Sequence, residues 1–153
     1  MMKPLSKLAR MWLTRTTKRF TFTNDYDEKL NYLACDNLGL YVHIPFCKKI
    51  CNFCPYCKTA FEEQKAEKYV TALLKEIRLV GERGKAETGE KKRTTSLYFG
   101  GGTPALLAHR LKEIISVLEE YFVITEGVGV ELHPDNVTEE TLQTLKDAGV
   151  TKI

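Results

Sequence analysis

The sequence lacks a long hydrophobic run, and none of its apolar stretches approaches the roughly 20 residues needed to cross a bilayer. It also lacks the long apolar core that follows the charged start of a secretory signal. We therefore expect a cytoplasmic protein with neither a membrane span nor an export signal. Otherwise the composition, with 43% hydrophobic and 28% charged residues, is that of an ordinary folded protein.

Acidic residues are missing from the start of the chain, where six Lys and Arg residues precede Asp25, the first acid. Subtracting these six from the 23 basic residues leaves 17 against 20 acidic residues, so the rest of the chain is slightly acidic. That balance argues against a nucleic-acid partner, which would need a basic face on the folded part. The basic residues 1–38 are interpreted as a solvated N-terminal extension, with an organelle transit peptide as the alternative.

Short strand-like runs alternate with longer helix-like runs, which is typical of βα units around a parallel sheet. The predicted strands are Leu40–Ile44, Ser96–Phe99 and Val128–Leu132, and the predicted helices are about Phe61–Val80, Ala105–Phe122 and a third that Thr138 caps and Gly149 ends. Gly81 should end the first helix, and the charged, glycine-containing residues 81–93 should form a solvated loop. Val150–Ile153 resembles the opening of a fourth strand, so we expect residues 39–153 to be the first three βα units of a longer domain.

The cysteines are not spread as a disulfide framework would require. Four of the five fall between Cys47 and Cys57, where the spacing is C-x3-C-x2-C with a further Cys three positions later. In a chain without an export signal, such a cluster indicates metal binding. Three thiolates on one short loop can each bind a different iron of a 4Fe-4S cubane, which leaves one iron open to a chelating molecule.

Other interpretations of the cluster stay open. Zinc sites usually pair two Cys-x2-4-Cys knuckles, and no second pair of Cys or His residues follows here. Cys51, Cys54 and Cys57 match the start of a ferredoxin motif, but Phe61 stands where its fourth cysteine should be. Four unligated structural thiols would suit a core better than this polar loop.

Three segments together resemble the radical S-adenosylmethionine superfamily: YVHIPFCKKICNFC from Tyr41, GGGTP from Gly100, and ELHP from Glu131. The chain is most similar to the oxygen-independent coproporphyrinogen III oxidases and their heme-chaperone relatives, over roughly residues 39–153. The resemblance implies an α/β fold, the N-terminal half of a partial (β/α)6 barrel with parallel strands. It also implies a 4Fe-4S cluster and S-adenosylmethionine as cofactors, with reductive cleavage of S-adenosylmethionine yielding a radical that abstracts hydrogen from a substrate.

The resemblance also assigns residues to the cofactors. It implies cluster ligation by Cys47, Cys51 and Cys54, and contacts with S-adenosylmethionine by Tyr41, Phe53, Gly101, Gly102, Thr103 and Glu131. Alternation along the first strand independently places Tyr41 and His43 on one face of the sheet. For His43, a satisfied interior histidine and a functional role both stay open. Local pattern further predicts that Thr103 caps the second helix, that Glu131 faces inward, and that His109 and His133 lie on the surface.

The closest resemblance implies oxidative decarboxylation of a porphyrinogen propionate in heme metabolism. The partners would be a porphyrin-like small molecule and a reductant such as flavodoxin or ferredoxin. The oxidases carry a further Cys two residues after the third ligand, where this chain has Tyr56, and its extra thiol is Cys57. A heme chaperone, a radical methylase, a heme-degrading enzyme and a non-enzymatic 4Fe-4S electron-transfer module are therefore kept as alternatives. Whether these 153 residues act alone stays open.

Overall fold

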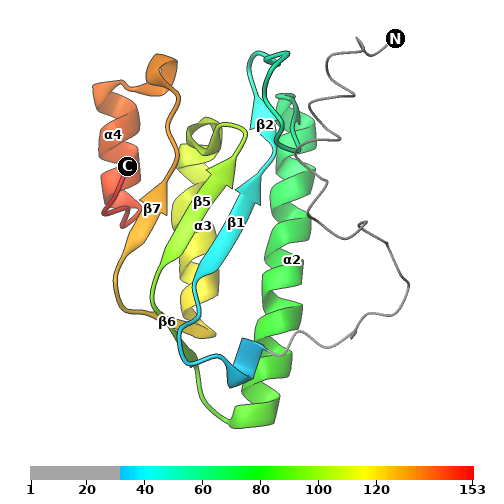
Figure 1. The fold of residues 1–153 in the computed structure, drawn as a ribbon, viewed down its shortest axis with the longest axis vertical. Helices are drawn as coiled ribbons and strands as arrows, with labels where there is room; N and C mark the ends of the chain where they lie inside the picture. Colours follow the sequence, from blue (N-terminus) through cyan, green and yellow to red (C-terminus); the bar gives the residue numbers. More distant parts are fainter. Residues whose placement is uncertain (1–31) are drawn as a thin grey trace, which may run out of the picture. The chain divides into compact units, whose positions relative to one another are not determined.

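The structure is a computed structural model that describes residues 32–153, so the prediction of a basic extension over residues 1–38 lies largely outside the described residues. The main sheet has three parallel strands (Figure 1). In spatial order they are β1 (Leu40–Ile44), β5 (Leu97–Gly101) and β7 (Val128–Val130). The predicted α/β class and the parallel strand direction are both confirmed.

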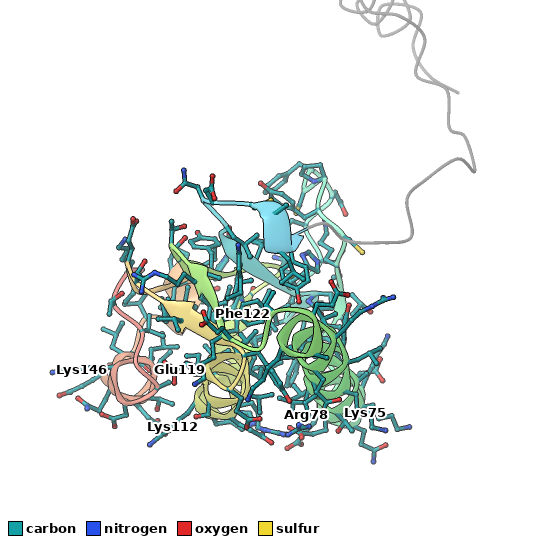
Figure 2. All side chains as sticks on the ribbon, turned by 90° about the horizontal axis from the view of Figure 1, so that it is seen from below. Lys75, Arg78, Lys112, Glu119, Phe122 and Lys146 are labelled. Carbon is teal, nitrogen blue, oxygen red and sulfur yellow. The ribbon has the colours of Figure 1, made fainter. Side chains whose placement is uncertain are left out.

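The helices of the described part cover one face of this sheet, as Figures 1 and 2 show. They are α2 (Glu63–Thr88), α3 (Ala108–Glu119) and α4 (Glu139–Asp147). Two further parallel pairs join β2 (Phe46–Cys47) to β3 (Thr59–Ala60), and β4 (Lys92–Thr94) to β6 (Phe122–Ile124). Short 3-10 turns are η1 (Tyr32–Ala34), η2 (Pro104–Leu107) and η3 (Pro134–Asn136). In Figure 2, Lys75 and Arg78 of α2 point away from the sheet, which leaves the apolar stripes of the helices to face it.

The core lies between the sheet and the helices, and alternation along each strand supplies the sheet's contribution. On β1, Val42 and Ile44 are 6% and 0% exposed, whereas Tyr41 on the opposite face is 57% exposed. Leu111 and Ile114 of α3 are fully buried against the sheet side. Each such side chain stabilises the fold by about 1.5–3 kcal/mol when it leaves water. The predicted division of β1 into two faces is confirmed, and it leaves Tyr41 on the open face.

Helix α2 is longer than predicted. It continues to Thr88, so the expectation that Gly81 ends it and that a loop begins there is wrong. A Cβ atom at Gly81 would overlap the ring of Tyr121, and one at Gly84 would overlap the hydroxyl of Tyr32. These glycines therefore let two aromatic rings approach the helix closely. The helix ends at Gly89, whose φ of 75° suits a left-handed cap and whose N–H donates to the carbonyl of Lys85.

The second predicted helix, Ala105–Phe122, is divided. It begins as the 3-10 turn η2, continues as α3, and ends before Phe122, which starts β6. Thr103 takes the N-cap position of η2 and Pro104 its first turn, as predicted, but the Thr103 side chain makes no capping hydrogen bond. The pairing of β4 with β6 joins residues about 30 positions apart along the chain. A local sequence pattern does not predict a pairing of this kind.

The third unit follows its prediction more closely. The hydroxyl of Thr138 accepts a hydrogen bond from the N–H of Thr141 and so caps α4, and Gly149 follows that helix with a φ of 90°. Strand β7 ends at Val130, two residues earlier than predicted. A parallel bridge between Gly129 and Lys152 lies where the fourth strand was expected to open.

Candidate functional site

Three connections meet at one edge of the sheet because parallel strands end on the same side. The cysteine loop, defined as residues 47–58, follows β1. The glycine segment, defined as residues 100–104, begins in the last two residues of β5 and continues beyond it, and Glu131 follows β7. Together they line a pocket of about 360 Å³. Its lining includes Cys47, Cys51, Cys54, Phe53, Gly101, Gly102, Thr103 and Glu131. Every residue predicted to bind the cluster or its companion cofactor is therefore brought together, with the exception of Tyr41.

The cysteine loop is closed at its base by the short β2–β3 pair. The N–H of Thr59 donates to the carbonyl of Pro45 at 2.7 Å, and the N–H of Phe61 donates to the carbonyl of Cys47 at 2.9 Å. All of its thiols are free of disulfides. The pKa of the Cys54 thiol is lowered, chiefly by a hydrogen bond from the backbone of Tyr56 and then by Lys58. This environment favours the thiolate, which is the form that binds iron.

The donor set fits an iron-sulfur cluster in its chemistry. Three soft sulfur donors line one pocket, and the hydroxyl of Thr103 lies 3.9 Å from the sulfur of Cys47 as a further weak partner. Within residues 32–153, no three Cys, His, Asp or Glu side chains gather as a single metal ion would require. Ligation of a cubane is different, because each thiolate binds its own iron and the sulfurs stand further apart than around one ion.

The glycine segment packs directly against the start of the cysteine loop. A Cβ atom at Gly102 would lie 2.6 Å from the carbonyl oxygen of Phe46, and the Gly102 N–H donates to the carbonyl of Ile44 at 2.8 Å. The N–H of Thr103 continues this contact by donating to the carbonyl of Phe46 at 2.8 Å. Main chain therefore touches main chain, and a side chain at Gly102 would separate the two segments.

Thr103 is 7% exposed, and its hydroxyl points to the sulfur of Cys47 rather than to a helix N–H. A residue predicted as a helix cap is thus turned toward the predicted cluster ligands. Thr103 therefore lines the pocket, and its contact with a cofactor stays a prediction.

The Glu131 carboxylate lies on the open face of the sheet, beside the end of β5. Its Oε2 accepts a hydrogen bond from the N–H of Gly101 at 3.0 Å, and its Oε1 lies 3.5 Å from the hydroxyl of Tyr98. The residue is exposed, so it faces the open pocket and is not enclosed. A carboxylate oxygen has two lone pairs, and both oxygens keep acceptor capacity for an ammonium or hydroxyl group in the pocket.

Tyr41 does not line this pocket but lies beside residues that do. Its ring stacks on Tyr98, with centroids 6.3 Å apart and planes 20° apart, and its hydroxyl is 3.3 Å from Nδ1 of His43. Burial raises the pKa of Tyr41, with the Glu131 charge as the next cause. Tyr41 is therefore a neighbour of Glu131, and its own contact with a cofactor stays a prediction.

Several pocket residues were missed by sequence reasoning. They are Lys48, Lys49, Tyr56 and Lys58 of the cysteine loop and His133, Asp135 and Asn136 after β7. His133 is exposed at the surface as predicted, yet its ring also accepts a hydrogen bond from the N–H of Asp135 at the start of η3. The only available signal was its position in the ELHP motif. His109 also lies at the surface, near Glu67.

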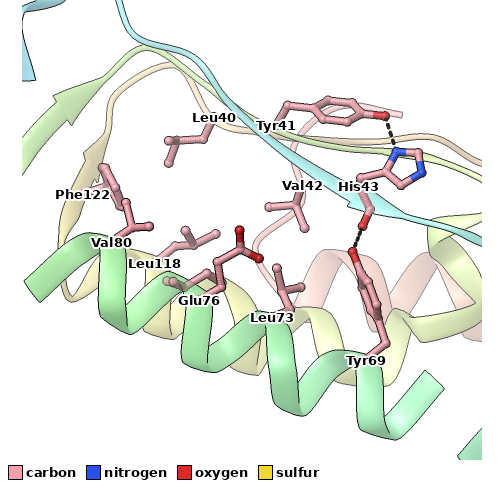
Figure 3. Close-up of a pocket in the computed structure, with 11 residues that line it drawn as sticks. Leu40, Tyr41, Val42, His43, Tyr69, Leu73, Glu76, Val80, Leu118 and Phe122 are labelled. Atoms are coloured by element: carbon pink, nitrogen blue, oxygen red, sulfur yellow. Dashed lines mark hydrogen bonds between the residues drawn. The ribbon is translucent and has the colours of Figure 1, made fainter. Parts of the chain in front are cut away.

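A second pocket, of about 300 Å³, lies between β1 and α2 (Figure 3). Its walls are mostly apolar and include Leu40, Val42 and Leu73, with the carboxylate of Glu76 directed into it. None of the predicted cluster ligands lines it. Among the helices of residues 32–153, none combines the length and the hydropathy that a bilayer span requires.

Comparisons with known proteins agree with this geometry. The chain is 33% identical over 118 residues to the heme chaperone HemW of Bacillus subtilis (strain 168), which covers 74% of this chain and 30% of that protein. It is 30% identical over 120 residues to the oxygen-independent coproporphyrinogen III oxidase of Paracoccus denitrificans, covering 75% of this chain and 26% of that protein. The chain thus spans less than a third of the length of these relatives.

A solved structure of coproporphyrinogen III oxidase from Escherichia coli, described as a radical SAM enzyme, superposes with a TM-score of 0.64 and 31% identity. The match covers 74% of this chain and 26% of that one, so the fold corresponds to a fragment of the oxidase. The model of the Radical SAM superfamily matches residues 41–153, which include the cysteine loop, the glycine segment and Glu131. With these three segments meeting at one pocket, the chain belongs to the radical SAM superfamily.

Proposed function

We propose that the chain holds a 4Fe-4S cluster on Cys47, Cys51 and Cys54 and binds S-adenosylmethionine in the adjoining pocket. The observation that carries the proposal is the pocket itself, because it collects the three thiols, the glycine segment and Glu131 from three separate strand ends. When bound, the reduced cluster supplies one electron for cleavage of S-adenosylmethionine, which starts hydrogen abstraction from a substrate.

The chain's own residues prepare this pocket in distinct ways. The Tyr56 backbone and Lys58 favour the thiolate of Cys54, and Thr103 supplies a hydroxyl beside the sulfur of Cys47. Gly101 and Gly102 carry no side chain that would block a ligand, and their N–H groups already donate to Glu131 and to the Ile44 carbonyl. Glu131, already oriented by Gly101, is placed to accept hydrogen bonds from amino or hydroxyl groups.

Phe53 is the aromatic member of the pocket and is 89% exposed. A ring that is this accessible can cover the face of a purine, because stacked aromatic surfaces leave water together. We assign it the adenine end of the ligand and Glu131 the polar end. Tyr41 is assigned a supporting contact from beside Glu131.

The proposed substrate is a porphyrin-related small molecule, and the reaction is related to that of coproporphyrinogen oxidase. This assignment is supported by the relatives named oxygen-independent coproporphyrinogen III oxidase and by the structural match. The proposed electron source is a small reductant such as flavodoxin or ferredoxin. The chain covers only 30% and 26% of the lengths of these two relatives, so the activity of the whole protein is part of this proposal.

A second candidate function is heme binding by a chaperone that uses the same fold. Two observations favour it: a relative named heme chaperone, and Tyr56 at the position where the oxidases carry a further Cys. Heme titration of the reconstituted chain separates the two functions. Tight heme binding without turnover of a porphyrinogen would select the chaperone.

The primary test is anaerobic reconstitution with iron and sulfide, followed by paramagnetic resonance of the reduced protein. We expect close to four irons per chain, and a resonance that changes when S-adenosylmethionine is added. A cluster resonance that is unchanged by S-adenosylmethionine would instead favour an electron-transfer module. Purified protein that takes up zinc and no iron would contradict the proposal altogether.

A further inference from the structure

His43 occupies the open face of β1, but its contacts reach well beyond that strand. Its Nε2 lies 2.8 Å from the carbonyl oxygen of Cys57, which is 14 residues further along the chain. Its Nδ1 lies 3.3 Å from the hydroxyl of Tyr41. Figure 3 shows the second contact, together with the hydrogen bond from the Tyr69 hydroxyl to the His43 carbonyl. Both the ring and the main chain of His43 are therefore held in place.

The partners of the ring determine where its proton lies. A backbone carbonyl can only accept, so Nε2 carries the hydrogen and donates it to Cys57. Nδ1 of the neutral ring is then an acceptor, and the hydroxyl of Tyr41 donates to it. Both ring nitrogens therefore have a hydrogen-bond partner, and the two contacts fix the orientation of the imidazole.

The same ring also packs on the glycine segment. A Cβ atom at Gly101 would meet three ring atoms of His43, at 2.5 to 3.0 Å. His43 thus touches Gly101 and Cys57 at once. Gly101 belongs to the segment that orients Glu131, and Cys57 belongs to the far half of the cysteine loop.

That far half has few ties to the sheet. The β2–β3 pair closes only the base of the loop, while Cys54 is held by neighbours within the loop, namely Cys51 and Lys58. A loop that is fixed at its base still samples many conformations at its tip, and each added tie removes part of that freedom. A hydrogen bond from a sheet residue to Cys57 fixes the loop three residues after its last proposed ligand.

We propose that His43 is a positioning residue that clasps the cysteine loop to the glycine segment through Cys57 and Gly101. The inference rests on the proposed function only in that the loop carries the cluster ligands. The clasp itself is a property of the metal-free chain. It predicts that loss of the Nε2 donor loosens residues 51–58 before any cofactor is bound.

Two substitutions of His43 separate the donor from the size of the side chain. His43→Gln places an amide N–H about where Nε2 stands, whereas His43→Asn places it near Nδ1, too short to reach Cys57. His109→Asn is the matched control, because His109 is exposed on α3 and contacts Glu67 instead. All three replacements are polar and fit the space of the original ring.

The measurement is brief trypsin digestion of the metal-free full chain, with cleavage after Lys58 compared with cleavage after Arg83 in α2. Opening of the native loop sets the first rate, and opening of the helix sets the second. We expect His43→Asn to speed cleavage after Lys58 by about three- to tenfold relative to Arg83, the range for one lost hydrogen bond. We expect His43→Gln and His109→Asn to match the parent chain.

A second measurement is iron and sulfide uptake on anaerobic reconstitution, in which His43→Asn should retain clearly less than His43→Gln. Equal rates of cleavage after Lys58 in the parent chain, His43→Gln and His43→Asn would overturn the proposal. Cleavage of His43→Gln as fast as that of His43→Asn would also overturn it. The outcome is independent of the proposed function. If the parent chain takes up no iron, the cluster proposal fails, while the cleavage ratios still decide the role of His43.

Discussion

The carboxylate of Glu131 accepts a hydrogen bond from the backbone N–H of Gly101 at 3.0 Å, which joins the end of β7 to the end of β5. The residues lie 30 positions apart in sequence, at the ends of two adjacent strands of the sheet. With this bond made, the carboxylate can still accept hydrogen bonds from the pocket that the three cysteines also line. A ligand with an amino or hydroxyl group would therefore meet an oriented negative charge.

Replacement of Glu131 by Gln should weaken binding of S-adenosylmethionine without unfolding the chain. The amide oxygen still accepts from Gly101, but the negative charge is lost, and charge-assisted hydrogen bonds are about twice as strong as neutral ones. We expect roughly a tenfold rise in Kd, measured by equilibrium dialysis of the reconstituted protein. Glu139→Gln in α4 is the control, and equal affinities for the two variants would remove Glu131 from the binding site.

Cys54→Ser and Cys57→Ser should differ in iron content after anaerobic reconstitution. Serine supplies a hard oxygen in place of a soft thiolate, so loss of a true ligand costs the cluster. We expect Cys54→Ser to hold little iron and Cys57→Ser to hold as much as the parent chain, because Cys57 lies outside the pocket lining. If Cys57→Ser also loses its iron, the ferredoxin-type ligand set of Cys51, Cys54 and Cys57 would be favoured instead.

Gly102→Ala should destabilise the chain. The added methyl group would stand 2.6 Å from the Phe46 carbonyl oxygen, so the two backbones must move apart. Overpacking of this kind costs about 1–3 kcal/mol of unfolding free energy. Gly39→Ala is the matched control, since the nearest atom to its Cβ is 3.7 Å away. Denaturant unfolding of both variants measures the difference, and equal midpoints would show that the contact at Gly102 is easily relieved.

Gly81→Ala should have opposite effects in two backgrounds. In the parent chain the methyl group would overlap the Tyr121 ring, which we expect to lower the unfolding free energy by about 1–3 kcal/mol. In a Tyr121→Ala background the overlap disappears, and alanine should then stabilise the helix by about 0.5–1 kcal/mol over glycine. Denaturant unfolding of the four chains forms a double-mutant cycle. A stabilising Gly81→Ala in both backgrounds would contradict the tight packing of Tyr121.

Sequence patterns predicted those features whose causes are local. Alternation in residues 40–44 predicted β1 and its two faces, and the spacing of the cysteines predicted their shared loop. Alternation also predicted that Glu131 faces inward, and its position beside the glycine segment was learned from the structure. These inferences needed only the periodicity of the chain and the rule that parallel strands end at one edge.

What escaped prediction depends on distant partners. Glycine normally weakens a helix, so Gly81 was predicted to end it and Gly84 to lie in a loop. In the structure Tyr121 and Tyr32 pack on these two glycines. Likewise, Thr103 has the usual character of a cap, but its hydroxyl lies beside a cysteine 56 positions earlier in the chain. The bond from His43 to Cys57 depends on the course of the loop, which the residue types alone do not specify.

Gly102 and the Phe46 carbonyl meet through main-chain atoms, and their close approach requires that position 102 carry no side chain. The distance between the two segments is thus set by the main chain. Selectivity for a new ligand can instead be changed through side chains of the lining, such as Lys48, Tyr56 and Asn136. An engineer who wants altered selectivity should therefore randomise these lining side chains and leave Gly102 and Phe46 unchanged.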